Sequence, residues 1–193
     1  MNHLRRALVI AILTASSGAL LIPMTHADPP ETNEPRPEQA EQRFERFEGT
    51  WRLDQPRDEA QQVVSEAVED AANQFNFMIR GIARSRLREG TPVHSRVEVS
   101  FEGDQVTVRF GDESYTTELG RTEVRRNPEG EEMRVTQRIR PNGQLEQVFE
   151  TEGGTRRYVY TPLSDGRMRI ATTTDSPRMP QPMYFMLDYR RAA

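Results

Sequence analysis

The chain has 193 residues, a formal charge of −4 and no cysteine. This length fits one domain plus a removable segment, and the lack of cysteine excludes disulfides, thiol nucleophiles and thiolate metal sites. All 26 basic residues are arginine, so a Schiff-base lysine is excluded as well, and the acidic balance disfavours nucleic acid and anionic lipid surfaces as partners.

The first 27 residues have the layout of a secretory signal peptide. Arg5 and Arg6 precede an apolar core at 7–22, and Thr25-His26-Ala27 forms a small-x-small cleavage site. The core is short for a membrane span, which takes roughly 20 residues. We therefore expect cleavage after Ala27, no stable membrane anchor afterwards, and a periplasmic or secreted protein. Loss of the two arginines takes the formal charge from −4 to −6.

Residues 28–43 are rich in Pro, Glu, Gln and Asn, a composition typical of a disordered linker. The folded domain is then 44–193. Its first predicted strand contains Gly49-Thr50-Trp51, and burial of the single tryptophan in the core is the simplest expectation because an indole carries so much apolar area.

A helical insertion is predicted at 58–89. Its apolar residues recur every three or four positions, which indicates one stripe along a helix. Asp58 is the expected N-cap, Gly81 the expected break between a long and a short helix, and Gly90 with Pro92 the expected end. We expect the stripe to pack against the inner face of a sheet, with a membrane or partner face as the alternative.

The run from His94 to Arg191 alternates apolar and polar residues between Gly, Asn and Asp turns, as in Val97, Val99 and Phe101 followed by the turn at 102–104. This pattern is typical of antiparallel hairpins with one wet face. The predicted fold is mainly β: an antiparallel up-and-down meander barrel of about ten strands, with the helical insertion between the first and second strands.

This order of elements resembles the lipocalin-like (calycin) β-barrels, and fatty-acid-binding proteins most closely. The resemblance rests on Gly49-Thr50-Trp51, the helical insertion, the hairpin series and the tail Tyr189-Arg190-Arg191. It implies a barrel with a ligand cavity, and an arginine of the tail stacked on Trp51. The Arg-x-Tyr carboxylate clamp of that family is replaced here by Leu187-Asp188-Tyr189.

Catalytic chemistry finds little support. His94 is the only histidine left after cleavage, and no nucleophile-elbow motif accompanies it; a hydrolase acting through His94 is the third hypothesis. Met183 and Met186 have opposite strand parity, so a shared metal site with Met179 is not expected. Arg157 would suit a ligand carboxylate if it pointed inward, but its apolar neighbours indicate the outer face. We expect no enzyme, no metal and no cofactor.

The first hypothesis is therefore an exported, non-catalytic barrel that binds a small apolar or amphiphilic ligand. The alternative is a structural or interaction protein of the cell envelope with a filled core. The sequence leaves the ligand and the oligomeric state open. The expected ligand-binding residues are those of apolar parity on the strands and two residues of the helix: Val97, Val99, Phe101, Val108, Phe110, Val135, Tyr158, Tyr160, Ile170, Met78 and Ile82.

Overall fold

The computed structural model describes residues 44–126 and 130–192, and the predicted signal peptide (1–27) and linker (28–43) lie outside them. The described residues contain two helices, α2 (Arg57–Asn73) and α3 (Phe77–Glu89). The strands are β1 (Gly49–Leu53), β2 (Arg96–Glu102), β3 (Gln105–Phe110), β4 (Glu113–Glu118), β5 (Thr122–Arg126), β6 (Glu132–Ile139), β7 (Leu145–Thr151), β8 (Gly154–Pro162), β9 (Arg167–Asp175) and β10 (Met183–Arg191).

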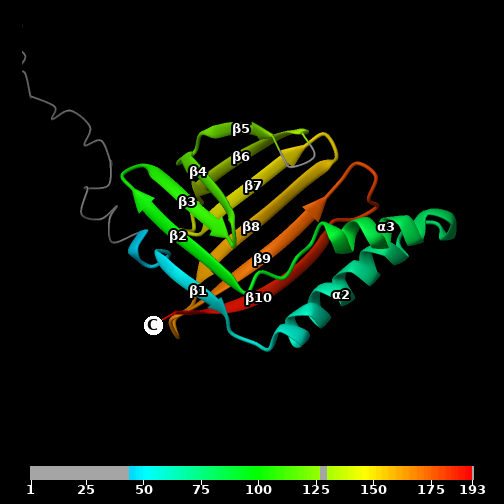
Figure 1. The fold of residues 1–193 in the computed structure, drawn as a ribbon, viewed down its shortest axis with the longest axis horizontal. Helices are drawn as coiled ribbons and strands as arrows, with labels where there is room; N and C mark the ends of the chain where they lie inside the picture. The colour runs from blue at the N-terminus through cyan, green and yellow to red at the C-terminus, as the bar shows by residue number, and fades with distance from the viewer. Residues whose placement is uncertain (1–43, 127–129, 193) are drawn as a thin grey trace, which may run out of the picture. The chain divides into compact units, whose positions relative to one another are not determined.

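The strands form one antiparallel sheet in the order β4-β3-β2-β1-β10-β9-β8-β7-β6-β5. Chain neighbours pair throughout, except that β1 pairs with β10 and β4 does not pair with β5. The sheet curls into a nearly closed barrel (Figure 1). The predicted up-and-down meander with helices inserted between the first and second strands is confirmed.

Side chains bridge the open seam between β4 and β5. Arg125 donates from Nη1 to the carbonyl oxygen of Ser114 at 2.9 Å and from Nη2 to that of Thr116 at 3.1 Å. The buried amide of Gln137 reaches across from β6 and donates to the carbonyl oxygens of Val106 and Tyr115, both at 3.1 Å. The Arg125 bonds supply donors to carbonyl groups of the edge strand β4, and the Gln137 bonds connect β6 to β3 and β4.

The inner face of the barrel holds the apolar positions of the alternation. Val97 and Val108, both fully buried, lie in adjacent strands whose register sets Val99 opposite Val108. Trp51 is 2 % exposed, as predicted, and its indole N–H donates to the carbonyl oxygen of Phe47 at 2.8 Å. Arg191 supplies the expected stacking cation, with Cζ 4.8 Å from the Trp51 ring centroid.

The helical insertion breaks at a different place from the one predicted. Asn76 caps α3 by accepting from the backbone N–H groups of Met78 and Ile79, whereas Gly81 lies inside α3. The break falls at 74–76 because an Asn side chain there satisfies the free N–H groups of a new helix. Asp58 is also not the N-cap. It lies in the first turn of α2, which follows Pro56, and there a carboxylate favours the helix dipole.

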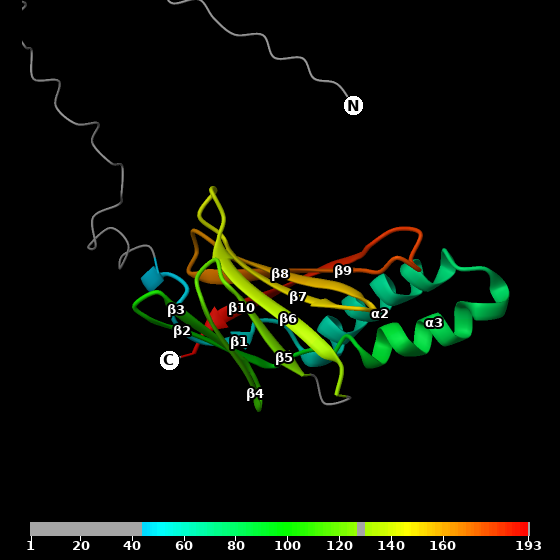
Figure 2. The same cartoon turned by 90° about the horizontal axis from the view of Figure 1, so that it is seen from above.

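Only the first helix buries its apolar stripe. α2 places Ala60, Val64 and Val68 in the barrel core, whereas α3 has no buried residue. Phe77 and Met78 at the start of α3 are 83 % and 76 % exposed. Both helices lie at one end of the barrel (Figure 2). The expectation that the whole stripe packs against the sheet therefore holds for α2, whereas in α3 Leu87 is only partly buried against the core.

Among the described residues, neither helix has the length and apolar character needed to cross a bilayer.

Candidate functional site

A cavity of about 910 Å³ lies between α3 and the inner face of the sheet. Ile79, Ile82 and Leu87 line it from the helix, and Met179 lines it from the segment between β9 and β10. Because α2 and not α3 fills the core, α3 covers this space without occupying it. The volume is within the range of roughly 300–1,000 Å³ that is usual for small-molecule sites.

Four aromatic rings, each from a different strand, form one wall of the cavity. Tyr115 and Phe149 meet edge to face with centroids 4.7 Å apart, and Phe110 lies 5.2 Å from Tyr158. Phe149 and Tyr158 complete the cluster at 5.9 Å. The rings offer an apolar surface with two phenolic hydroxyl groups, so they can contact an apolar chain and also orient a polar group.

Two polar atoms in the same wall have no partner. Arg156 on β8 lies directly opposite Thr174 on β9, and both residues line the cavity. Arg156 Nε and Thr174 Oγ1 are buried and make no hydrogen bond within the described residues. Such groups are rare in folded proteins because each loses its hydration without replacement. A donor pair of this kind beside a cavity is suited to an oxyanion.

The end of α3 lies close to this arginine. A Cβ atom at Gly90, the residue that follows α3, would lie 3.2 Å from Arg156 Nη2. The absence of a side chain at Gly90 therefore lets the helix end approach the guanidinium closely.

Three titratable groups of the cavity, His94, Tyr115 and Tyr158, have pKa values shifted toward their neutral forms. Burial lowers the pKa of His94; Glu113 opposes this shift and Arg156 adds to it. Burial raises the pKa of Tyr158, and burial together with a hydrogen bond to Glu113 raises that of Tyr115. The Tyr115 hydroxyl donates to Glu113 Oε2 at 2.9 Å.

A buried polar network lies next to the aromatic wall, at the inward-facing positions that neighbour Tyr158 and Phe149 on their strands. The Tyr160 hydroxyl donates to Gln147 Oε1 at 2.8 Å, and Gln147 Nε2 donates to Gln137 Oε1 at 3.2 Å. All three residues are fully buried. Their hydrogen-bonding groups are already engaged with one another, so this layer is packed structure and the ligand space ends above it.

Only some of the residues predicted to bind a ligand line the cavity. Phe110, Tyr158 and Ile82 line the cavity. Phe101 stacks on Phe44 at 4.6 Å, and Met78 is exposed. The remaining residues are buried in the barrel interior away from the cavity lining: Val97, Val99, Val108, Val135, Tyr160 and Ile170.

Sequence reasoning missed the polar part of the site. Arg157 points outward, as its neighbours indicated, and its Nε lies 3.1 Å from Glu146 Oε1. The inward arginine is Arg156, and the signal was its shared parity with Tyr158 and Tyr160. No sequence pattern marked Thr174 as a site residue, because its role depends on the register that sets it opposite Arg156.

Within residues 44–126 and 130–192, no three or more His, Cys, Asp or Glu side chains are grouped to hold a metal ion.

No protein-family model matches the chain, and no curated protein matches it. Similar solved structures include a fatty-acid-binding protein 1 of Echinococcus granulosus, with 14 % identity, TM-score 0.48, and coverage of 77 % of this chain and 99 % of that one. Wild-type fluorescent protein UnaG has 19 % identity, TM-score 0.49, and coverage of 77 % and 99 %. A REP1-NXSQ fatty acid transporter has 14 % identity, TM-score 0.43, and coverage of 76 % and 96 %.

A fatty-acid-binding protein and a fatty acid transporter are thus among the similar structures, as the order of elements suggested.

Proposed function

We propose that the mature protein is an exported, non-catalytic carrier that binds one small amphiphilic molecule with an acidic group inside the barrel. The observation that carries this proposal is the unpaired donor pair, Arg156 Nε and Thr174 Oγ1, in the wall of an aromatic cavity. The acidic group accepts from the donor pair, and the apolar part lies against Phe110, Phe149 and Tyr158.

Two contributions favour such a complex. Each Å² of apolar surface removed from water stabilises it by about 25 cal/mol. An oxyanion at Arg156 also provides the hydrogen bond that the buried Nε lacks, and a buried donor without a partner costs about 1–3 kcal/mol. A purely apolar ligand gains only the first contribution, so we expect acidic amphiphiles to bind more tightly than neutral ones.

The surroundings of His94 support a binding role rather than catalysis. The lowered pKa of His94 arises mainly from burial. The His94 ring packs on Phe110 with centroids 4.7 Å apart, and its carbonyl oxygen accepts from Tyr189. No serine or threonine hydroxyl bonds to its ring within the described residues. Export rests on the predicted signal peptide.

The second candidate is an interaction protein of the envelope, favoured by the exposed apolar side chains Phe77 and Met78 at the start of α3. It needs no molecule inside the barrel, so a ligand-binding measurement separates the two.

The test is fluorescence titration of the full mature chain with 1-anilinonaphthalene-8-sulfonate, an apolar anion, followed by displacement with dodecanoate or dodecanol. We expect saturable binding of one probe per chain and more effective displacement by the acid. Failure to saturate, or equal displacement by acid and alcohol, would contradict an acid-selective cavity.

A further inference from the structure

The outer wall of the barrel carries an unusual cluster around Glu146 on β7. Leu145 and Gln147 on either side are buried in the interior, so Glu146 points outward, yet its side chain has no exposed surface. Three guanidinium groups cover it. Arg138 Nε lies 2.5 Å from Oε2, while Arg140 Nη2 and Arg157 Nε lie 2.6 Å and 3.1 Å from Oε1. We call Arg138, Arg140 and Arg157 the arginine triad.

The triad carries more positive charge than Glu146 neutralises. Burial works against ionisation of Glu146, but hydrogen bonds from Arg138 and Arg140 hold its pKa below the ordinary value, so the carboxylate is charged at neutral pH. Three cations against one anion leave a local charge of +2. This surplus lies on a protein of net negative charge, and no other carboxylate forms an ion pair with the triad among the described residues.

Two members of the triad have donor groups that are not engaged with Glu146. Arg138 and Arg157 contact the carboxylate through Nε, and their Nη groups make no hydrogen bond within the described part of the chain. Their side chains are 56 % and 41 % exposed, so these groups face solvent. Glu146 holds the guanidinium groups on one side, which lowers the entropic cost of binding a further anion.

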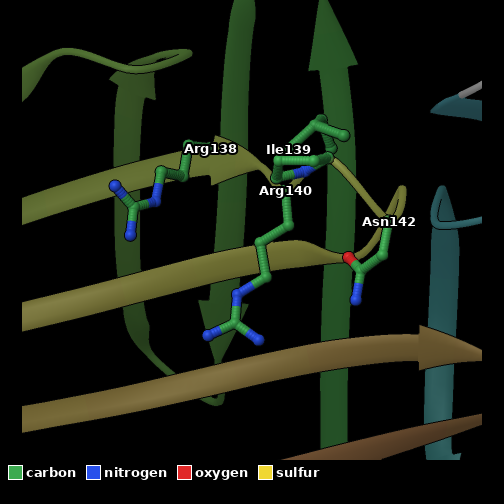
Figure 3. A pocket seen from close by; sticks show the side chains of 5 residues that line it. Arg138, Ile139, Arg140 and Asn142 are labelled. Carbon is green, nitrogen blue, oxygen red and sulfur yellow. The ribbon is translucent and has the colours of Figure 1, made fainter.

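A surface recess adjoins the triad at the end of β6. Its volume is about 530 Å³, and its lining consists of Arg138, Ile139, Arg140, Pro141 and Asn142. Figure 3 shows the side chains of Arg138, Arg140 and Asn142 extending to the same side of the hairpin. The recess therefore presents two guanidinium groups and one amide group to the same volume of solvent.

We propose that the arginine triad is a second binding site, separate from the cavity, for a phosphate dianion. Guanidinium groups bind phosphate oxygens through paired N–H donors, and a charge of about −2 on a phosphate group at neutral pH matches the local surplus. The same chemistry is offered by free phosphate and by the phosphomonoester headgroup of a lipid.

The experiment uses the full mature chain labelled with ¹⁵N. Inorganic phosphate is titrated at constant ionic strength while the arginine Nε–H resonances are followed by NMR. We expect saturable shifts of the Arg138 and Arg157 resonances. Arg138→Gln and Arg157→Gln should each weaken phosphate binding by about fivefold or more, because each removes a charged donor pair.

Arg134→Gln is the matched control, since Arg134 is exposed on the same strand and face and pairs with Glu132 rather than with Glu146. It should change phosphate binding by less than about twofold. Because each triad variant leaves two guanidinium groups on Glu146, we expect both to fold, and circular dichroism checks this. Sedimentation with phosphatidylcholine vesicles, with or without phosphatidic acid, then distinguishes the lipid source from the free ion.

The proposal is overturned if the shifts do not saturate, if chloride at equal ionic strength reproduces them, or if Arg134→Gln weakens binding as much as the triad variants. The cavity is probed separately with the anilinonaphthalene dye, so either site can fail while the other stands.

Discussion

Arg156 and Arg157 are consecutive residues of β8 that face opposite sides of the barrel wall. Arg156 lines the cavity opposite Thr174, whereas Arg157 contacts Glu146 on the outer wall. The alternation of a strand separates two identical side chains into an apolar interior and a solvated surface, and it provides a pair of variants that differ only in which face loses a guanidinium.

Arg156→Met should weaken binding of an acidic amphiphile such as dodecanoate by about tenfold or more, since a hydrogen bond to a charged group contributes about 1.5–3 kcal/mol. Binding of dodecanol should be unchanged or tighter, because methionine adds apolar surface. Arg157→Met, the control, should leave both affinities unchanged. Dye displacement measures all three proteins, and an equal loss of affinity in the two variants would refute the assignment of Arg156.

His94 should make stability depend on pH in a definite window. Burial lowers the pKa of folded His94 below 6.5, so as pH falls below 6.5 the unfolded chain takes up a proton that the folded chain resists, and stability declines. The decline from this group stops once pH falls below the folded pKa. Glu146, with an ordinary pKa of 4.5 that is lowered in the fold, loses its contribution only below 4.5.

Urea unfolding measured between pH 6.5 and pH 4.5 therefore isolates the contribution of His94 to the free energy of unfolding. His94→Gln should flatten the stability profile in that window. If the variant keeps the slope of the wild type, His94 is not the responsible group.

Gln137→Leu should destabilise the protein by about 1–3 kcal/mol, because it leaves the buried amide of Gln147 and the hydroxyl of Thr117 without their partner. Gln137 Nε2 donates to Val106, Tyr115 and Thr117, and Gln137 Oε1 accepts from Gln147. Faster hydrogen exchange in β3 and β4 should accompany the loss, since these bonds cross the open seam. Gln105→Leu, at an exposed position of β3, is the control in denaturant unfolding. Similar losses in the two variants would show that the seam does not depend on Gln137.

Arg191→Ala should lower stability by about 0.5–2 kcal/mol by removing the cation above Trp51. The same substitution exposes the indole, so the emission maximum of the single tryptophan should move to longer wavelength. Arg190→Ala is the control, because Arg190 lies on the outer face of β10 and pairs with Asp54 at 3.8 Å. An unchanged emission maximum in the Arg191 variant would contradict the stacked geometry.

The sequence pattern predicted the structure correctly where neighbouring residues along the chain determine it. Alternation and turn residues predicted the hairpins, and Gly90 correctly marked the end of α3. The break between the helices was misplaced at Gly81, because an exposed glycine inside a helix is tolerated at a cost of about 1 kcal/mol, whereas the cap at Asn76 satisfies two backbone donors.

The sequence by itself determined an antiparallel meander of about ten strands and the side of the wall on which its alternating residues lie, because these follow from a two-residue period and from short turns. Only the tertiary structure decided which inward positions face open space. Val108 and Phe110 share one strand and one parity, yet only Phe110 lines the cavity. That difference depends on how far α3 lies from the sheet and on which distant strands face each other, and both are set by contacts between residues remote in sequence.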